Sequence, residues 1–332
     1  MRVGIVGCGL IGGKRAAALE DEDRLVATYD LVSDRARALA AKYKAEACAS
    51  LEELVAKSDV VVVATTNDQL TPVAMVAVQA GKHAVVEKPA ARSAAELEPL
   101  ARAAQERGVV VKVGFNHRFH PAAQKAREIL TAGGAGDVMF IRGRYGHGGR
   151  IGYDKEWRAD PARSGGGELI DQGVHLVDLA RFFFDAELVD VQGRVETYFW
   201  QMPVDDNAFL TLRTAGGQTA FLHASCSEWK NLFSLEIYGR VGKIAIDGLG
   251  GSYGLERLTF YRMLPEMGPP ETTTFEFPPP DMSWASEFEE FLADIRAGRV
   301  PAAGLADARA ALAVVERIYA ASPTVRAGVV AG

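Results

Sequence analysis

The chain has 332 residues and a mass of 35.7 kDa, which is enough for about two domains. Apolar residues make up 48% and charged residues 24%, the ordinary mixture of a globular protein, which argues against a disordered chain. The net charge of −6 gives no basic surface for nucleic acid, and no apolar run is long enough to cross a membrane. Three widely spaced cysteines argue against a disulfide framework or a cysteine zinc site, so we expect a cytoplasmic protein without a metal.

The first part of the chain alternates strand-like and helix-like segments. Short apolar strands are expected at Val3–Gly7, Leu25–Asp30, Val60–Ala64, Ala84–Glu87 and Val109–Val113, with a helical segment between each strand and the next. Two of these helices open with a capping box, at Ser50 and at Ser93. Such alternation predicts parallel βαβ units in a doubly wound α/β sheet.

After about Phe119 the pattern changes. One more helix is expected at Ala122–Ala132, and another helical segment at Leu169–Phe183. From Val189 to Phe277 the chain reads as strands joined by short turns, with Gly216-Gly217 as a tight hairpin turn. Consecutive strands of this kind predict a mostly antiparallel sheet, and two helices then close the chain.

A glycine motif lies between the first predicted strand and the first predicted helix. Gly7-Cys8-Gly9-Leu10-Ile11-Gly12 matches G-x-G-x-x-G in the context that this motif requires. Gly7 allows the tight turn, Gly9 lets a pyrophosphate approach the backbone, and Gly12 lets the helix pack on the strand. We therefore predict a dinucleotide site at Gly7, Gly9, Leu10, Ile11 and Gly12.

An acidic residue ends the second predicted strand. Asp30 lies 18 residues beyond Gly12, where a carboxylate accepts hydrogen bonds from the hydroxyls of the adenosine ribose. Because it would repel a 2′-phosphate, NAD is favoured over NADP. Arg35 and Arg37 lie nearby in the sequence and leave NADP open.

Two further motifs carry candidate catalytic groups. Glu87-Lys88-Pro89 ends a strand at the carboxyl edge of the predicted sheet, where ligands bind in such folds. Farther along, Asp171 and His175 follow a run of three glycines and share a helix face if the helix begins near Gly167. Histidine suits proton transfer near neutral pH, and a carboxylate one turn away can orient the ring. Asp178 lies three residues beyond His175, so the spacing leaves open which carboxylate is its partner.

These three motifs, in this order and spacing, resemble the glucose-fructose oxidoreductase / inositol dehydrogenase / MocA family over essentially the whole chain. The resemblance implies a Rossmann NAD(P)-binding domain over residues 1–119. It implies an α+β domain with a large, mostly antiparallel open sheet over residues 120–332, which binds substrate and forms oligomers. The C-terminal helices are expected to pack back toward the first domain.

The resemblance also implies roles for individual residues. Lys88 contacts both the nicotinamide ribose and the substrate, His175 is the acid/base, and Asp171 assists it. A cis peptide bond is expected before Pro89. Further cofactor contacts carry over to Thr65, Thr66, Asn67, Glu87, Asn116, Trp157 and Arg158, and a further substrate contact to Arg118. The chain departs from the common pattern at Thr66, where proline is usual, and at Leu70, where histidine is usual.

We therefore predict an NAD(P)-dependent dehydrogenase that acts on CH–OH groups. A hydride passes between the nicotinamide and a secondary alcohol or ketone of a sugar, inositol or nucleotide sugar, and the partner is a second copy of the chain in a homodimer or homotetramer. One alternative is a glycosidase or lyase relative that oxidises its substrate only transiently. Another is a catalytically silent nucleotide-binding sensor. The polar-aromatic stretch Glu228–Asn231 reads equally well as substrate-facing or as a subunit contact.

Overall fold

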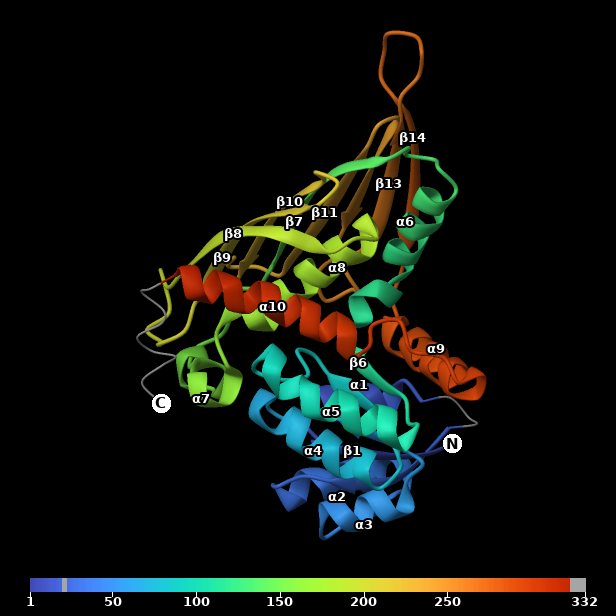
Figure 1. The fold of residues 1–332 in the computed structure, drawn as a ribbon, viewed down its shortest axis with the longest axis vertical. Coiled ribbons are helices and arrows are strands. Elements are labelled where there is room, and N and C mark those ends of the chain that lie inside the picture. Colours follow the sequence, from blue (N-terminus) through green and yellow to red (C-terminus); the bar gives the residue numbers. More distant parts are fainter. Residues whose placement is uncertain (20–22, 323–332) are drawn as a thin grey trace. The chain divides into compact units, whose positions relative to one another are not determined.

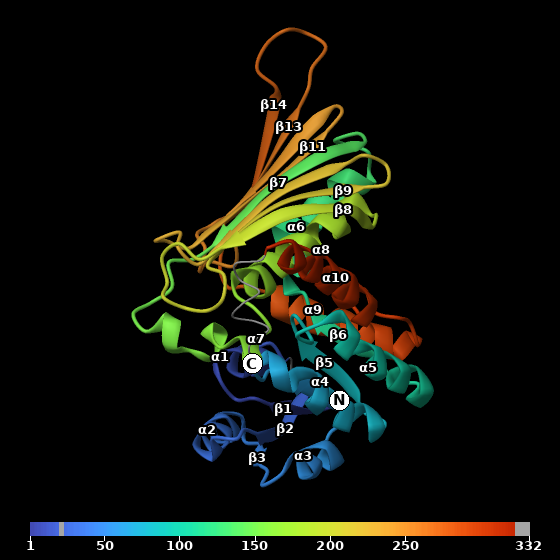
Figure 2. The same cartoon turned by 60° about the vertical axis from the view of Figure 1, so that its left-hand side comes forward.

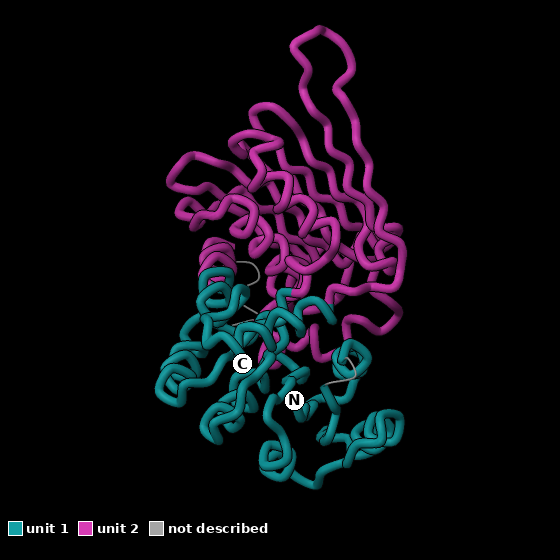
Figure 3. The backbone as a smooth tube through the Cα atoms, turned by 90° about the vertical axis from the view of Figure 1, so that its right-hand side faces the viewer, with its two compact units in different colours: residues 1–115, 284–312 teal, residues 116–283, 313–332 magenta. Residues whose placement is uncertain are grey.

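The computed structural model describes residues 1–19 and 23–322, which form two compact units (Figure 3). Unit 1 comprises Met1–Phe115 together with Trp284–Leu312, and unit 2 comprises Asn116–Ser283 together with residues 313–322. No helix within the described ranges is both long and apolar enough to cross a bilayer.

Unit 1 contains a six-stranded parallel sheet with the order β3-β2-β1-β4-β5-β6 (Figure 1). This order reverses direction between β1 and β4, which confirms the predicted doubly wound sheet. Its strands are β1 (Arg2–Val6), β2 (Arg24–Tyr29), β3 (Glu46–Ala47), β4 (Val60–Val63), β5 (His83–Glu87) and β6 (Val111–Gly114). The helices between them are α1 (Leu10–Ala17), α2 (Ser33–Tyr43), α3 (Leu51–Lys57), α4 (Asn67–Gln79) and α5 (Ala94–Arg107).

Local sequence explains where these elements begin and what they bury. The side chains of Ser50 and Ser93 accept hydrogen bonds from the amides of Glu53 and Glu96, so both predicted caps are present. All four valines of β4 are buried, as expected for a central strand covered on both faces. Helix α9 (Ser283–Ala297) completes the core, because its apolar face packs on β1, β4 and β5 through Phe288, Phe291 and Leu292.

Unit 2 contains an eight-stranded sheet with the order β14-β13-β12-β11-β7-β10-β9-β8 (Figure 2). The β7–β10 pair is parallel and the other neighbouring pairs are antiparallel, which confirms the predicted mostly antiparallel sheet. Its strands are β7 (Val138–Gly146), β8 (Leu188–Glu196), β9 (Asn207–Thr214), β10 (Thr219–Ser225), β11 (Leu232–Gly239), β12 (Gly242–Asp247), β13 (Glu256–Arg262) and β14 (Glu271–Phe277).

Helices α6 (Pro121–Thr131) and α8 (Val174–Phe184) cover one face of this sheet (Figure 2). Gly143 of β7 lets α8 approach the sheet closely, because a Cβ there would lie within 3.3 Å of side-chain atoms of Leu176, Leu222 and Leu235. Short helices connect the other elements: 3₁₀ turns at Asn116–Phe119, Tyr153–Lys155 and Trp157–Ala159, α7 (Pro161–Ser164), and a π-helical turn at Leu169–Gly173. The chain ends its described part with α10 (Leu305–Ala321).

Candidate active site

The glycine loop between β1 and α1 has the close contacts that its motif requires. Gly7 adopts a φ of 89°, and a Cβ there would lie 2.3 Å from the backbone carbonyl oxygen that follows β4. A Cβ on Gly12 would lie 2.0 Å from the carbonyl oxygen of Gly7, whereas nothing lies within 4 Å of a Cβ on Gly9. Leu10 and Ile11 form the first turn of α1. The loop therefore fits a pyrophosphate, with open space at Gly9 and amides at a helix N-terminus.

Asp30 lies against this loop. Its carboxylate accepts a hydrogen bond from the amide of Cys8 at 2.8 Å and another from the amide of Val32, also at 2.8 Å. Each carboxylate oxygen has a second lone pair, so the fixed carboxylate can still accept bonds from ribose hydroxyls. Burial, and then the charge of Asp30, raise the pKa of the Cys8 thiol to about 12, so this thiol in the loop stays protonated.

The two basic residues that left NADP open lie in α2. Arg35 and Arg37 are both exposed, and the Arg37 guanidinium forms an ion pair with Asp34. An arginine paired with its own helix neighbour is less available to a 2′-phosphate, and Asp30 repels that group.

Thr65, Thr66 and Asn67 connect β4 to α4 at the carboxyl end of the sheet. Thr66 is the N-cap of α4, and its hydroxyl donates a hydrogen bond to Asp68 at 2.6 Å. Asn67 is buried, and so is Leu70, the position where histidine was expected. Leu70 is therefore a core residue of unit 1.

The Glu87-Lys88-Pro89 motif follows at the end of β5. The Lys88–Pro89 peptide bond is cis, as the resemblance implied, and Lys88 is half-buried. Lys88 thus lies at the carboxyl edge of the parallel sheet, the edge where doubly wound folds bind their ligands.

The Glu87 side chain is committed to a buried ion-pair network within unit 1. Arg15 of α1 donates to Glu87 at 2.6 Å and to Glu287 of α9 at 2.5 Å, and all three side chains are buried. Burial raises the pKa of Glu287, and the charge of Arg15 opposes that shift. The network joins α1, the helix after the glycine loop, to the residue before Lys88. The cofactor contact of Glu87 stays a prediction.

Asp171 and His175 lie in unit 2, in and after the π-helical turn. We assumed a regular α-helix from Gly167, but Leu169–Gly173 is π-helical and α8 begins only at Val174. The i, i+4 argument for a shared helix face therefore does not hold as stated. Single π turns inside helices are frequent at functional sites. His175 is 3% exposed.

Arg158 connects the predicted residues of the preceding loop to Asp171. Its Nε donates to the Asp171 carboxylate at 2.9 Å, and its guanidinium lies 4.6 Å from the centre of the Trp157 ring. The charge of Asp171 is the largest cause that raises the pKa of Arg158. Trp157, Arg158 and Asp171 therefore form one connected group. The sequence predicted the first two as cofactor contacts and Asp171 as a catalytic residue, without a link between them.

Arg118 and Asp178 form a buried, two-pronged ion pair. Arg118 Nε donates to Asp178 at 2.8 Å, and the Nη2 group pairs with the other carboxylate oxygen. Both side chains are buried, and the Arg118 guanidinium lies 5.4 Å from the centre of the Phe182 ring. The expected contact of Arg118 with substrate stays a prediction; within the structure Arg118 pairs with Asp178 and Arg158 pairs with Asp171.

His117, the residue after Asn116, lies beside His175. Asn116 is buried, its amide donates to Ser283 at 3.0 Å, and its carbonyl oxygen lies 3.2 Å from Nδ1 of His117. The His117 ring stacks on the His175 ring with centroids 3.7 Å apart. His117 was not among the predicted site residues, although it lies between two of them, Asn116 and Arg118.

Two residues distant in the sequence hold the glycine run in place. Asp205 accepts hydrogen bonds from the amides of Gly167 and Leu169, and from the Tyr319 hydroxyl at 2.8 Å. A Cβ on Gly166 would lie 2.2 Å from that hydroxyl oxygen, which explains why a glycine is needed there. Neither Asp205 nor Tyr319 stands in a recognisable motif, so the sequence offered no signal for them.

The polar-aromatic stretch at Glu228–Asn231 is partly exposed. Trp229 is 78% exposed, and its ring lies 4.9 Å from that of Phe199. Asn231 donates a hydrogen bond to the backbone of Ser252 at 2.9 Å.

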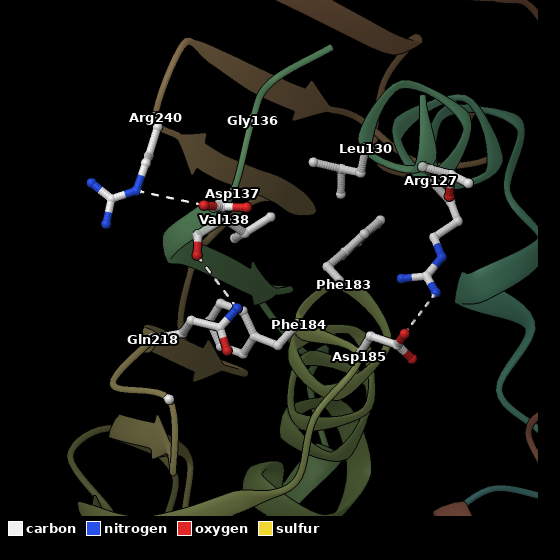
Figure 4. Close-up of a pocket in the computed structure, with 12 residues that line it drawn as sticks. Arg127, Leu130, Gly136, Asp137, Val138, Phe183, Phe184, Asp185, Gln218 and Arg240 are labelled. Atoms are coloured by element: carbon white, nitrogen blue, oxygen red, sulfur yellow. Dashed lines mark hydrogen bonds and ion pairs between the residues drawn. The ribbon is translucent and has the colours of Figure 1, made fainter. Parts of the chain in front are cut away.

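A separate cavity of about 620 Å³ lies in unit 2, between the ends of α6 and α8 and two hairpin turns (Figure 4). Arg127 and Arg240 each lie in an ion pair, with Asp185 at 3.6 Å and Asp137 at 3.7 Å. None of the described residues that line it belongs to the predicted site. Over the described part of the chain, no group of three or more His, Cys, Asp or Glu has an arrangement that would hold a metal.

Comparison with known proteins places the chain in a family. Residues 1–115 match the model for "Oxidoreductase family, NAD-binding Rossmann fold", and residues 123–245 match the model for "GFO/IDH/MocA C-terminal domain". The trans-1,2-dihydrobenzene-1,2-diol dehydrogenase of Mus musculus is 31% identical over 246 residues, which cover 70% of either chain. The UDP-N-acetylglucosamine 3-dehydrogenase of Acidithiobacillus ferrooxidans is 32% identical over 193 residues, 58% of this chain and 57% of that enzyme.

The solved structures agree on the fold. A levoglucosan dehydrogenase in complex with NADH and levoglucosan has a TM-score of 0.88 at 21% identity, with 98% of this chain and 97% of that chain covered. The predicted Rossmann fold and the predicted α+β fold with a mostly antiparallel sheet are thereby confirmed. The chain belongs to the Gfo/Idh/MocA family of NAD-binding oxidoreductases.

Proposed function

We propose that this chain is an NAD-dependent dehydrogenase that interconverts a secondary alcohol and a ketone on a polyhydroxylated substrate, namely a sugar, an inositol or a nucleotide sugar. The observation that carries the cofactor assignment is the Asp30 carboxylate fixed on the glycine loop, 2.8 Å from the amide of Cys8. The substrate class is supported by relatives named for sugar, inositol and nucleotide-sugar dehydrogenation.

The proposed mechanism divides the work between the two units. The glycine loop, Asp30 and the Thr65–Asn67 segment hold NAD, which when bound supplies the hydride acceptor. His175 takes the proton of the substrate hydroxyl, and the Lys88 ammonium holds the same oxygen and stabilises its developing negative charge. Asp171, fixed by Arg158, stabilises the imidazolium that forms on His175. Within this proposal Glu87, Asn116, Trp157 and Arg158 also contact the cofactor, and Arg118 contacts substrate.

A titration by calorimetry tests the cofactor assignment. We expect micromolar binding of NADH and much weaker binding of NADPH, because the Asp30 carboxylate accepts ribose hydroxyls and repels a 2′-phosphate. Asp30→Ser is expected to bring the dissociation constants of NADH and NADPH closer together. Glu52→Ser, which removes an exposed carboxylate of α3, is the matched control and should leave both constants unchanged. Equal or tighter binding of NADPH to the wild type would contradict the assignment.

With the cofactor known, a panel of polyols and sugars tests the reaction. Net accumulation of NADH in step with ketone formation supports the dehydrogenase. A product formed without net NADH would support the transient-oxidation alternative.

We further propose that the face of the unit 2 sheet opposite α8 joins copies of the chain into a homodimer or homotetramer. This face carries two stacked aromatic pairs, Phe140 with Tyr238 and Phe209 with His223, and Phe221 on it is 59% exposed. Exposed apolar patches of this kind mark interaction sites.

We propose a cytoplasmic location as well, because Cys8, Cys48 and Cys226 are all thiols.

Light scattering tests the oligomer. We expect a mass of two or four chains for the wild type, and a lower mass for Phe221→Glu, which places a charge in the centre of the patch. Met267→Glu changes an exposed residue outside this face and should leave the mass unchanged. A monomeric wild type would contradict the proposal.

A further inference from the structure

A second histidine lies directly against His175. The rings of His117 and His175 are nearly parallel, with centroids 3.7 Å apart and planes inclined by 20°. They are 5% and 3% exposed, respectively. The ring of Tyr145 stands edge-on to both, at 5.0 Å from His117 and 6.1 Å from His175. The stack belongs wholly to unit 2, and it joins the 3₁₀ turn after β6 to α8.

A chain of hydrogen bonds fixes the protonation of one nitrogen of His117. The Ser283 hydroxyl donates to Asp281 at 2.7 Å, so its oxygen accepts the bond from the Asn116 amide nitrogen at 3.0 Å. The Asn116 carbonyl oxygen therefore faces Nδ1 of His117, 3.2 Å away, and Nδ1 must carry a proton. Any change in the charge of His117 then takes place at Nε2.

Several charged groups surround the stack. One is buried Glu168, whose charge acts on Tyr145 and whose carboxylate lies 3.9 Å from Nε2 of His147. Arg118 is neutralised by Asp178, and His120 lies 5.6 Å from His117 with its Nδ1 2.9 Å from Glu256 and 3.9 Å from Asp281. Burial raises the pKa of Tyr145 well above its usual range, so it remains neutral. The Phe233 ring lies 6.0 Å from the His117 ring, and Asp171 forms an ion pair with Arg158.

We propose that His117 and His175 form a coupled pair that carries at most one positive charge, so that His117 sets the pH range in which His175 can accept a proton from substrate. Two imidazolium rings stacked at this distance in a buried site repel each other, and a proton on one ring therefore disfavours a proton on the other. His117 is a positioning and charge-setting residue for His175. Its catalytic consequence rests on the proposed function, in which His175 is the base.

Nuclear magnetic resonance tests the coupling without any need for activity. The chain has six histidines, and the signal of His175 can be identified by its loss in His175→Asn. In the full-length protein labelled at histidine, His117→Phe keeps a stacked ring that cannot titrate. We expect the titration midpoint of His175 to rise by about one pH unit in this variant, because the repulsion by a second charge is lost.

Two further variants keep the test sharp. His117→Gln retains a donor toward Asn116 and should give the same rise if His117→Phe does not fold. His223→Phe is the matched control, because His223 also stacks on an aromatic ring, Phe209, at 4.5 Å but lies on the other face of the sheet. It should leave the midpoint of His175 unchanged. An unchanged or lower midpoint in both His117 variants, or a His175 that does not titrate in any of these proteins, would overturn the coupling.

The pH dependence of kcat/KM separates this inference from the proposed function. If the coupling and the proposed function both hold, the loss of kcat/KM for alcohol oxidation at low pH begins at a higher pH in His117→Phe than in the wild type. This shift matches the rise in the titration midpoint of His175. If the midpoint moves and the pH dependence of kcat/KM does not, the coupling stands and His175 is not the base. If neither moves while His175→Asn is inactive, the proposed base stands and the coupling is wrong.

Discussion

Replacement of His175 by asparagine is expected to lower kcat by about 10²- to 10⁴-fold, the usual contribution of a general acid/base. Asparagine is polar and of similar size, yet it cannot take the proton of the substrate hydroxyl. NADH binding should be unchanged, because the glycine loop and Asp30 belong to unit 1 whereas His175 belongs to unit 2. Steady-state kinetics and calorimetry on the same preparation measure the two quantities.

The matched control is His83→Asn, the same change at the first residue of β5, at the opposite end of that strand from Glu87. It should retain the kcat of the wild type. Near-normal turnover of His175→Asn would remove the proposed mechanism. Loss of NADH binding together with activity would instead indicate damage to the fold, and far-ultraviolet circular dichroism would show it.

Much of the fold could be predicted because it is determined by local sequence. The alternation of buried strands such as β4 with capped helices predicts the parallel sheet, and the caps at Ser50 and Ser93 are where the sequence places them. The glycine loop is equally local: the positive φ of Gly7 and the absence of room for a side chain at Gly12 both follow from one tight turn.

Other features depend on contacts between distant segments, which no local pattern contains. Helix α9 belongs to unit 1 and brings Glu287 to Arg15, although the whole of the unit 2 sheet lies between them in the sequence. Tyr319 likewise contacts the glycine run from far along the chain: its hydroxyl accepts a hydrogen bond from the Gly167 amide at 3.0 Å and donates one to Asp205 at 2.8 Å. The parallel pairing of β7 with β10 likewise has no local signal.

In the candidate site, too, some features follow from local sequence and others depend on contacts between distant segments. Motifs identified Lys88, Asp171 and His175 by residue type and spacing, but side-chain partners are set by packing. Glu87 and Arg118, which we expected near ligands, each bind an oppositely charged side chain in the interior. A π-helical turn replaced the regular helix that the spacing argument assumed, because propensity does not distinguish the two.

The Arg118–Asp178 pair leads to the largest expected effect on stability. Asp178→Asn should lower the free energy of unfolding by about 3–5 kcal/mol, the usual cost of removing one partner from a buried ion pair. The reason is that the Arg118 guanidinium, which is 6% exposed, loses its charged partner while it remains out of water. Urea unfolding followed by circular dichroism measures the change.

Two controls show whether burial is the cause. Asp34→Asn breaks the exposed pair with Arg37 and should leave stability close to that of the wild type, because solvent already screens these charges. The double variant Arg118→Met, Asp178→Leu removes both charges and fills the same space with apolar groups. It should be more stable than Asp178→Asn, since the desolvation cost of both ions is gone. A double variant no more stable than Asp178→Asn would show that the bidentate geometry itself, which fixes α8 and hence His175, provides the stability.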